Sequence, residues 1–150
     1  MSQILFAVDD ESTRSLLAVT FHKLPVQERT HIKSIIAAVT DADLTTAIRP
    51  FSFGGKVVHE LYFDPAKMLF FDRQEKIGAV VSAFIISCLA QNGHVPLSDQ
   101  TLRTHTKMIM RYAKRLKYGA EVSAFLRRYT ALEDEWRHNS FPNLPDDCDS

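Results

Sequence analysis

Two short apolar segments joined by a pair of glycines lie in the middle of the chain, and they constrain its fold more than any other feature. Residues 48–53 and 56–63 flank Gly54 and Gly55. A glycine pair supplies the positive φ angles of a two-residue turn, so the segments are predicted to form an antiparallel hairpin. A second turn at residues 64–67 precedes the apolar residues 68–71, which we expect to add a third strand. Residues 48–72 are therefore predicted to form an antiparallel meander.

Side chains along residues 56–63 alternate between two faces, as in a strand. The face that we expect to point toward the core carries Val57, His59, Leu61 and Phe63. His59-Glu60 would open a helical zinc-protease motif, but Phe63 occupies the position where the second histidine is needed. His59 is therefore interpreted as a half-buried strand histidine, and no metal site is predicted.

The remainder of the chain has mostly helical periodicity. Residues 13–23 and 25–39 each carry an apolar stripe at helical spacing, while residues 3–8 fit either a strand or an element that leads into a helix. Residues 77–90 are apolar nearly all round, which is typical of a central helix, and Asn92-Gly93 should end it. Further helices are expected over residues 98–116 and 120–136. The predicted fold class is α+β, with a small antiparallel meander packed on several helices and a helical C-terminal half.

The chain has 150 residues and no internal repeat, so we expect one α+β domain over residues 1–138. Residues 139–150 are acidic and contain two prolines, and they are predicted to form a mobile tail. Neither a leader segment nor an apolar stretch long enough for a bilayer is present, which predicts a cytoplasmic protein that makes no membrane contact.

Charge is distributed unevenly although 18 Lys and Arg balance 18 Asp and Glu. Residues 103–128 hold eight bases and one acid, about +7, whereas residues 133–150 sum to −5. Bases recurring every four residues form one stripe on the helix expected at 98–116, and like charges at this spacing repel each other by a few tenths of a kcal/mol per pair. The stripe predicts an anionic partner, which can be nucleic acid, an acidic protein surface or the chain's own tail; a merely solvated face is the alternative. The candidate binding residues are Arg103, Lys107, Arg111, Lys114 and Arg115.

No arrangement of residues points to catalysis. Cys88 lies among apolar neighbours without the positive charge that a reactive thiolate needs, so it is interpreted as structural. Neither a glycine-rich phosphate loop nor a nucleophile elbow is present. We therefore expect a protein that is not an enzyme and that needs no cofactor.

Several segments, taken in order, resemble the ArdB/KlcA antirestriction family of plasmids and other mobile elements. The acidic start at residues 8–11 with Arg14, the aromatic strand and glycine pair at 51–55, the small-residue helix at 78–84 and the closing segments at 111–113 and 124–127 carry the likeness. The resemblance implies a non-enzymatic α+β accessory protein of a plasmid or phage that binds a host protein or protein–nucleic acid complex and counters type I restriction.

Two alternatives belong to other functional classes. Residues 98–111 resemble the recognition helix of LuxR-type helix-turn-helix regulators, which implies a DNA-binding transcriptional regulator using the helix at 98–116. The other alternative is an immunity or inhibitor protein that binds a partner protein through the aromatic meander, with Tyr62 or Phe71 exposed. Burial of these aromatic side chains would argue against it.

Overall fold

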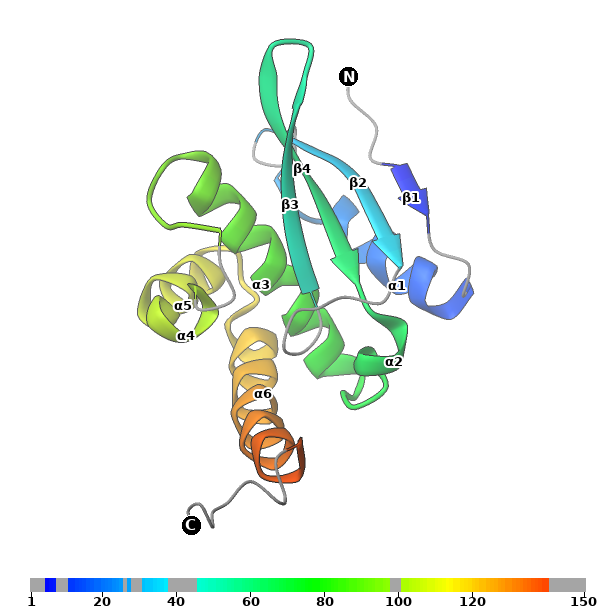
Figure 1. Cartoon of the computed structure of the whole chain (residues 1–150), viewed down its shortest axis with the longest axis vertical. Helices are drawn as coiled ribbons and strands as arrows, with labels where there is room; N and C mark the ends of the chain where they lie inside the picture. The colour runs from blue at the N-terminus through cyan, green and yellow to red at the C-terminus, as the bar shows by residue number, and fades with distance from the viewer. Residues whose placement is uncertain are drawn as a thin grey trace.

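The fold is a mixed four-stranded sheet covered by helices, as seen in a computed structural model that describes residues 5–7, 11–25, 27, 31–37, 46–97 and 101–140 (Figure 1). The strand order is β1-β2-β4-β3, with β1, β2 and β4 parallel and β3 antiparallel to β4. The strands are β1 (Leu5–Ala7), β2 (Ile32–Ala37), β3 (Thr46–Phe53) and β4 (Lys56–Phe63). The α+β class and the helical C-terminal half are confirmed.

The predicted hairpin is formed by β3 and β4. Phe53 pairs with Lys56 across the turn, in which Gly54 and Gly55 have φ angles of 59° and 81°. Two positive φ angles define the tight turn that matches strand twist, which explains why glycine occupies both positions. β3 is an edge strand, and it tolerates Pro50 because a proline there removes no hydrogen bond from the interior of the sheet.

The prediction of a third strand in the meander is wrong, because the chain forms the short helix α2 (Pro65–Met68) after β4. Asp64 caps this helix, since its side chain accepts hydrogen bonds from the backbone N–H groups of Ala66 (3.0 Å) and Lys67 (3.4 Å). Proline at the first helical position lacks only an N–H that would have no partner there. The turn predicted at residues 64–67 thus becomes a helical turn, and it turns the buried Phe71 toward Phe125.

The helix predicted at residues 25–39 is also wrong, because residues 32–37 form β2. Ile32 and Ile35 are both fully buried although they are three positions apart, a spacing that suits a helix and not a regular strand. The pairing register of β2 shifts between Ile32 and Ser34, and this irregularity brings both isoleucines to the same core. β1 pairs with β2 in parallel, and the helix α1 (Glu11–His22) lies between them along the chain. The helix predicted at residues 13–23 is thereby confirmed.

The alternation predicted for β4 holds in its second half and fails near the turn. His59, Leu61 and Phe63 are buried as expected, whereas Val57 is 51% exposed and its neighbour Val58 is buried. The distinction matters for the site, because it places His59 in the interior while Val57 stays at the surface.

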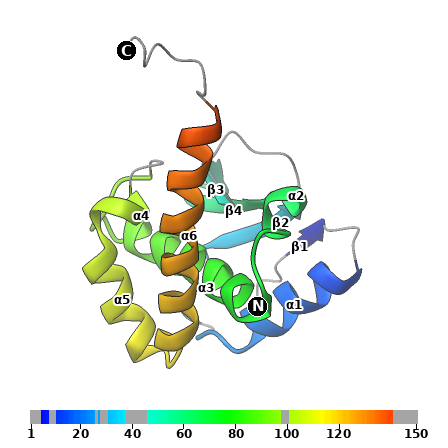
Figure 2. The same cartoon turned by 90° about the horizontal axis from the view of Figure 1, so that it is seen from below.

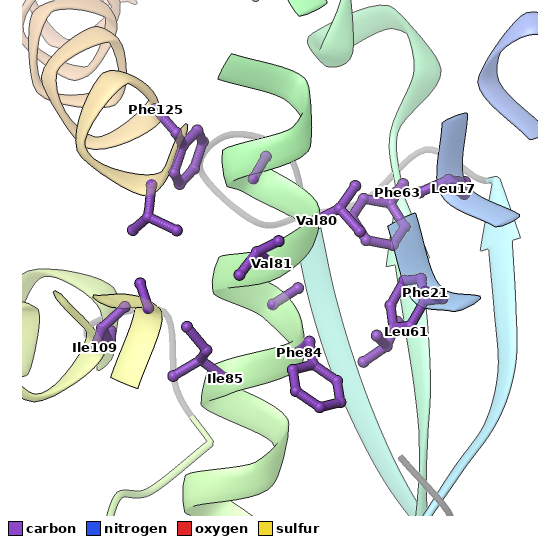
Figure 3. Packing of buried hydrophobic residues seen from close by; sticks show 14 of the residues in the cluster. Leu17, Phe21, Leu61, Phe63, Val80, Val81, Phe84, Ile85, Ile109 and Phe125 are labelled. Carbon is purple, nitrogen blue, oxygen red and sulfur yellow. The ribbon is translucent and has the colours of Figure 1, made fainter. Parts of the chain in front are cut away.

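The long helix α3 (Arg73–Gln91) lies at the centre of the molecule, as predicted for residues 77–90. Asp72 begins it with a capping box, and Asn92 and Gly93 end it, Gly93 with a φ of 78°. Figure 3 shows Val80 and Phe84 of α3 packed on one side toward Phe21, Leu61 and Phe63, and Val81 and Ile85 on the other side toward Ile109 and Phe125. One helix therefore holds together the sheet layer and the C-terminal helices.

The C-terminal helices are α4 (Thr101–Thr104), α5 (Thr106–Arg115) and α6 (Gly119–Ser140), which cover α3 on the side away from the sheet (Figure 2). Helix 98–116 was predicted as one element, but its described part is broken at His105, whose ψ of 31° leaves the helical region. The helix predicted at 120–136 is confirmed and extends to Ser140, so the predicted tail starts inside α6; residues 141–150 lie outside the described residues. None of the helices in the described ranges is long and apolar enough to cross a membrane.

Candidate functional site

Helix α5 presents a face of basic side chains because its opposite face is fixed in the core. Ile109 and Ala113 are fully buried. About 100° separates successive residues of a helix, so Lys107, Arg111, Lys114 and Arg115 fall on the side away from these two. All four side chains are exposed, and we call them the basic surface of α5. The predicted binding residue Arg103 lies in α4, on the other side of the break at His105, and its side chain lies outside the described residues.

Within the described residues, the basic surface has few anionic neighbours. A salt bridge joins Lys67 to Asp64 at 3.9 Å, and both residues are far along the chain from α5. Lys107, Arg111 and Lys114 form no salt bridge within the part of the chain that the structure describes. The guanidinium carbon of Arg115 lies 4.3 Å from the centre of the Tyr112 ring, a cation–π contact that holds both groups in place. The surface is thus a positive patch with one fixed aromatic ring.

A cleft of about 1010 Å³ opens beside this surface, between α5, the C-terminal end of α3 and residues 27 and 31. Arg111 and Arg115 line it, while Lys107 and Lys114 lie outside it on the far edge of the same helical face. We call it the α5 cleft, and its lining residues are Gln27, His31, Cys88, Leu89, Gln91, Asn92, His94, Met108, Arg111, Tyr112 and Arg115. Most of these lining residues are polar or charged, and Cys88, Leu89 and Met108 contribute the apolar part.

A second cleft of about 1140 Å³ lies along the hairpin. Its lining includes two lysines, Lys33 of β2 and Lys56 of β4. It also includes two histidines, His31 and His59. We call it the hairpin cleft, and its lining residues are His31, Lys33, Pro50, Gly54, Lys56, Val57, Val58, His59, Ala90, Gln91, Val95 and Leu97. Neither cleft is lined by an aspartate or glutamate of the described chain.

Two histidines and a serine form a hydrogen-bonded unit at the junction of the clefts. The Ser87 Oγ lies 2.7 Å from His31 Nε2 and 2.6 Å from His59 Nδ1. A hydroxyl has one proton to donate, so Ser87 donates to one imidazole and accepts an N–H from the other. The imidazole rings are perpendicular, with their centres 5.1 Å apart.

Both imidazoles are held in their neutral form. Burial is the larger cause that lowers the pKa of His31 to about 4, and the neighbouring His59 is the smaller one. Burial also lowers the pKa of His59, whose exposed fraction is only 2%. The histidines therefore contribute hydrogen-bonding groups to the clefts at neutral pH, and the positive charge comes from the lysines and arginines.

A serine beside an imidazole is also the arrangement of a nucleophile and its base. The Ser87 side chain is fully buried and lines neither cleft, so no substrate atom reaches its Oγ in this conformation. The unit instead joins α3, β4 and the residue before β2. Across the described ranges, no three His, Cys, Asp or Glu residues come close enough to hold a metal ion.

The structure brings some of the predicted residues together and separates others. Arg111 and Arg115 share a cleft, whereas Lys107 and Lys114 remain on the outer surface and Arg103 is in another helix. Cys88 is 3% exposed at the floor of the α5 cleft. His31 and Ser87 were missed, because they are 56 positions apart and only the packing of α3 against the sheet places Ser87 beside His31 and His59.

A scan against family models, a search of curated proteins and a search of solved structures each find no match to this chain.

Proposed function

We propose that this protein is a non-enzymatic accessory protein that acts by binding an anionic macromolecular partner through the basic surface of α5. The observation that carries the proposal is the set of four exposed cations on one helical face, three of which have no salt bridge within the described residues. Like charges one turn apart repel each other. A bound anionic partner turns this cost into binding energy.

The partner in this proposal is a host protein–nucleic acid complex in the cytoplasm. The resemblance to the ArdB/KlcA family gives a specific form, in which the protein of a plasmid or phage counters type I restriction. Both the partner and this activity are parts of the proposal. The basic surface supports the anionic character of the partner, and the ordered resemblance supports its connection with restriction.

The proposed antirestriction activity is tested by the plating efficiency of unmodified phage on a type I restricting host. Expression of the protein is expected to raise plating, and the variant Lys107→Ala, Arg111→Ala, Lys114→Ala and Arg115→Ala is expected to lose this effect. A control with the same charge change replaces Arg14, Lys23, Arg73 and Arg127, all exposed and outside the basic surface. Unchanged restriction with the wild-type protein would refute the antirestriction activity.

Binding to an anion is tested separately on a heparin column. The wild type and the control variant are expected to elute at similar salt. The α5 variant is expected to elute at lower salt, because each lost cation reduces the number of counterions that are released when the protein binds. Equal elution of both variants would show that α5 is not the binding surface.

The two alternative functions differ in what the structure offers them. The break at His105 interrupts the helix of residues 98–116 that the regulator alternative requires, and only its second part, α5, is a continuous helix with exposed cations. Phe71 is 4% exposed, which argues against an aromatic docking surface that includes it. Tyr62 is half-buried, and its hydroxyl donates a hydrogen bond to Glu60 Oε1 at 2.8 Å.

A further inference from the structure

The α5 cleft and the hairpin cleft lie next to each other and share two lining residues. His31 and Gln91 line both of them, so the clefts meet at the C-terminal end of α3. Gln91 fixes this junction, because its side-chain amide donates a hydrogen bond to the backbone oxygen of Val57 (3.2 Å). Figure 1 shows the strands of the hairpin on one side of α3 and α5 on the other. We call the two adjoining clefts together the joined hollow, and its lining residues extend from the hairpin turn to α5.

The charges in this hollow are of one sign and lie toward its two ends. Lys33 and Lys56 belong to the hairpin side, and Arg111 and Arg115 to the α5 side. The described lining residues include no carboxylate. Two separate pairs of cations suit a ligand with repeated negative charges along its length better than a compact anion.

The shape of the hollow distinguishes between polyanions. A duplex is read by an element that protrudes into a groove of the DNA. In this protein the arginines line a concave surface, and α5 is fixed to the core by Ile109 and Ala113. A concave track fits a single flexible strand, as in the grooves of proteins that bind single-stranded nucleic acid.

The chemistry of the lining also favours nucleic acid over an acidic peptide. Tyr112, His31 and His94 provide flat rings on which bases can stack, and Arg115 is already placed over the Tyr112 ring. Gln27 and Asn92 carry amides that can donate to and accept from base edges. Carboxylate side chains of a peptide would use the cations but neither the rings nor the paired donors and acceptors.

We propose that the joined hollow binds single-stranded nucleic acid, with phosphates held by Arg111 and Arg115 at one end and by Lys33 and Lys56 at the other, and with bases against the Tyr112 side. This inference rests on the proposed function, because it specifies the anionic partner of the basic surface. It adds the hairpin side, which that function does not require.

The test measures the fluorescence anisotropy of a labelled oligothymidylate of about twelve nucleotides, a length within the usual range of single-strand sites. With four phosphate contacts, the logarithm of the binding constant should fall with the logarithm of salt with a slope of about −2.8. Replacing either cation pair, Arg111→Ala with Arg115→Ala or Lys33→Ala with Lys56→Ala, should reduce the slope by about 1.4. The control pair Arg14→Ala with Lys23→Ala should leave the slope unchanged.

Three outcomes would overturn the proposal. If duplex DNA of the same sequence binds as tightly as the single strand, the protein attracts phosphates without a groove that is specific for a single strand. Polyglutamate that competes as well as oligothymidylate would indicate an acidic protein partner. An unchanged slope in the Lys33 and Lys56 variant would show that the hairpin side takes no part. If the heparin experiment still depends on α5 in any of these cases, the proposed function stands and only the single-strand track falls.

Discussion

At the scale of single residues, the most informative contact is the hydrogen-bonded unit of His31, Ser87 and His59. A buried hydroxyl between a buried and a half-buried imidazole is costly unless all three groups are satisfied, and here each has a partner within 2.7 Å. The unit ties a helix to two positions on the sheet side of the molecule. It also fixes the two rings that line the hairpin cleft.

Acid should weaken the fold through this unit. The folded-state pKa of His31 is about 4 and its ordinary value is 6.5, so between these pH values the unfolded chain binds a proton that the folded chain does not. Its contribution to the free energy of unfolding is complete above pH 6.5 and is lost as the pH falls to about 4. The separation of the two pKa values corresponds to about 3 kcal/mol, and His59 acts in the same direction.

Urea unfolding above and below this pH window measures the effect. The variant His31→Gln is expected to show a shallower loss of stability with acid than the wild type. A wild-type stability that does not change across the window would contradict the assignment.

Lys117 has the left-handed backbone conformation that favours glycine, with a φ of 68°. It follows Leu116, the C-cap residue of α5, and its N–H and that of Tyr118 donate to Lys114 O (3.0 Å) and Ala113 O (2.9 Å). Lys117→Gly is expected to be about 1 kcal/mol more stable than Lys117→Ala, because both remove the charge and only glycine avoids the steric cost. Equal midpoints of denaturant unfolding for the two variants would disprove this.

At the scale of elements, the packing of α3 on α6 depends on Gly78. A β-carbon at this position would lie 2.0 Å from the backbone oxygen of Glu121 and 2.7 Å from Phe125 Cβ. The neighbouring group is backbone and cannot move aside like a flexible side chain, so the helices would have to separate.

Gly78→Ala is therefore expected to destabilise the protein by about 2 kcal/mol or more, despite the better helix propensity of alanine. Gly119→Ala is the matched control, because its β-carbon would come close only to the flexible Lys114 side chain, at 3.1 Å, and would lie at an ordinary contact distance of 3.8 Å from the Lys114 Cα. Thermal unfolding of both variants compares them directly, and a Gly78→Ala protein as stable as the control would contradict the close approach of α3 and α6.

Elements with local signals were predictable, and those that depend on partners were not. Gly54-Gly55 and Asn92-Gly93 specify their turns by backbone conformation alone. β2 was mistaken for a helix because its register shift buries Ile32 and Ile35 together, and such an irregularity exists only in the pairing with β4. The site follows the same division, since the basic spacing of α5 is local whereas the clefts and the His31–Ser87 contact require the tertiary fold.

At the scale of the whole molecule, the balance of 18 bases and 18 acids conceals a separation of charge along the chain. The exposed cations of α5 and the two clefts without carboxylates form one positive region of the described structure. Residues 141–150 contain three aspartates, Asp146, Asp147 and Asp149, and no base. The acidic segment therefore lowers the attraction of the molecule for any polyanion, at a range set by the ionic strength.

Removing residues 141–150 changes the net charge from zero to +3, since 15 acids then face 18 bases. We expect oligothymidylate to bind severalfold more tightly at low salt, because the remaining charges attract it without opposition. At about 1 M salt the difference should vanish, because charges are then screened within about 3 Å. The full-length variant Asp146→Asn, Asp147→Asn and Asp149→Asn should reproduce the gain if it comes from charge. A gain in the truncated protein alone, retained at high salt, would instead mean that the segment covers the basic surface by direct contact.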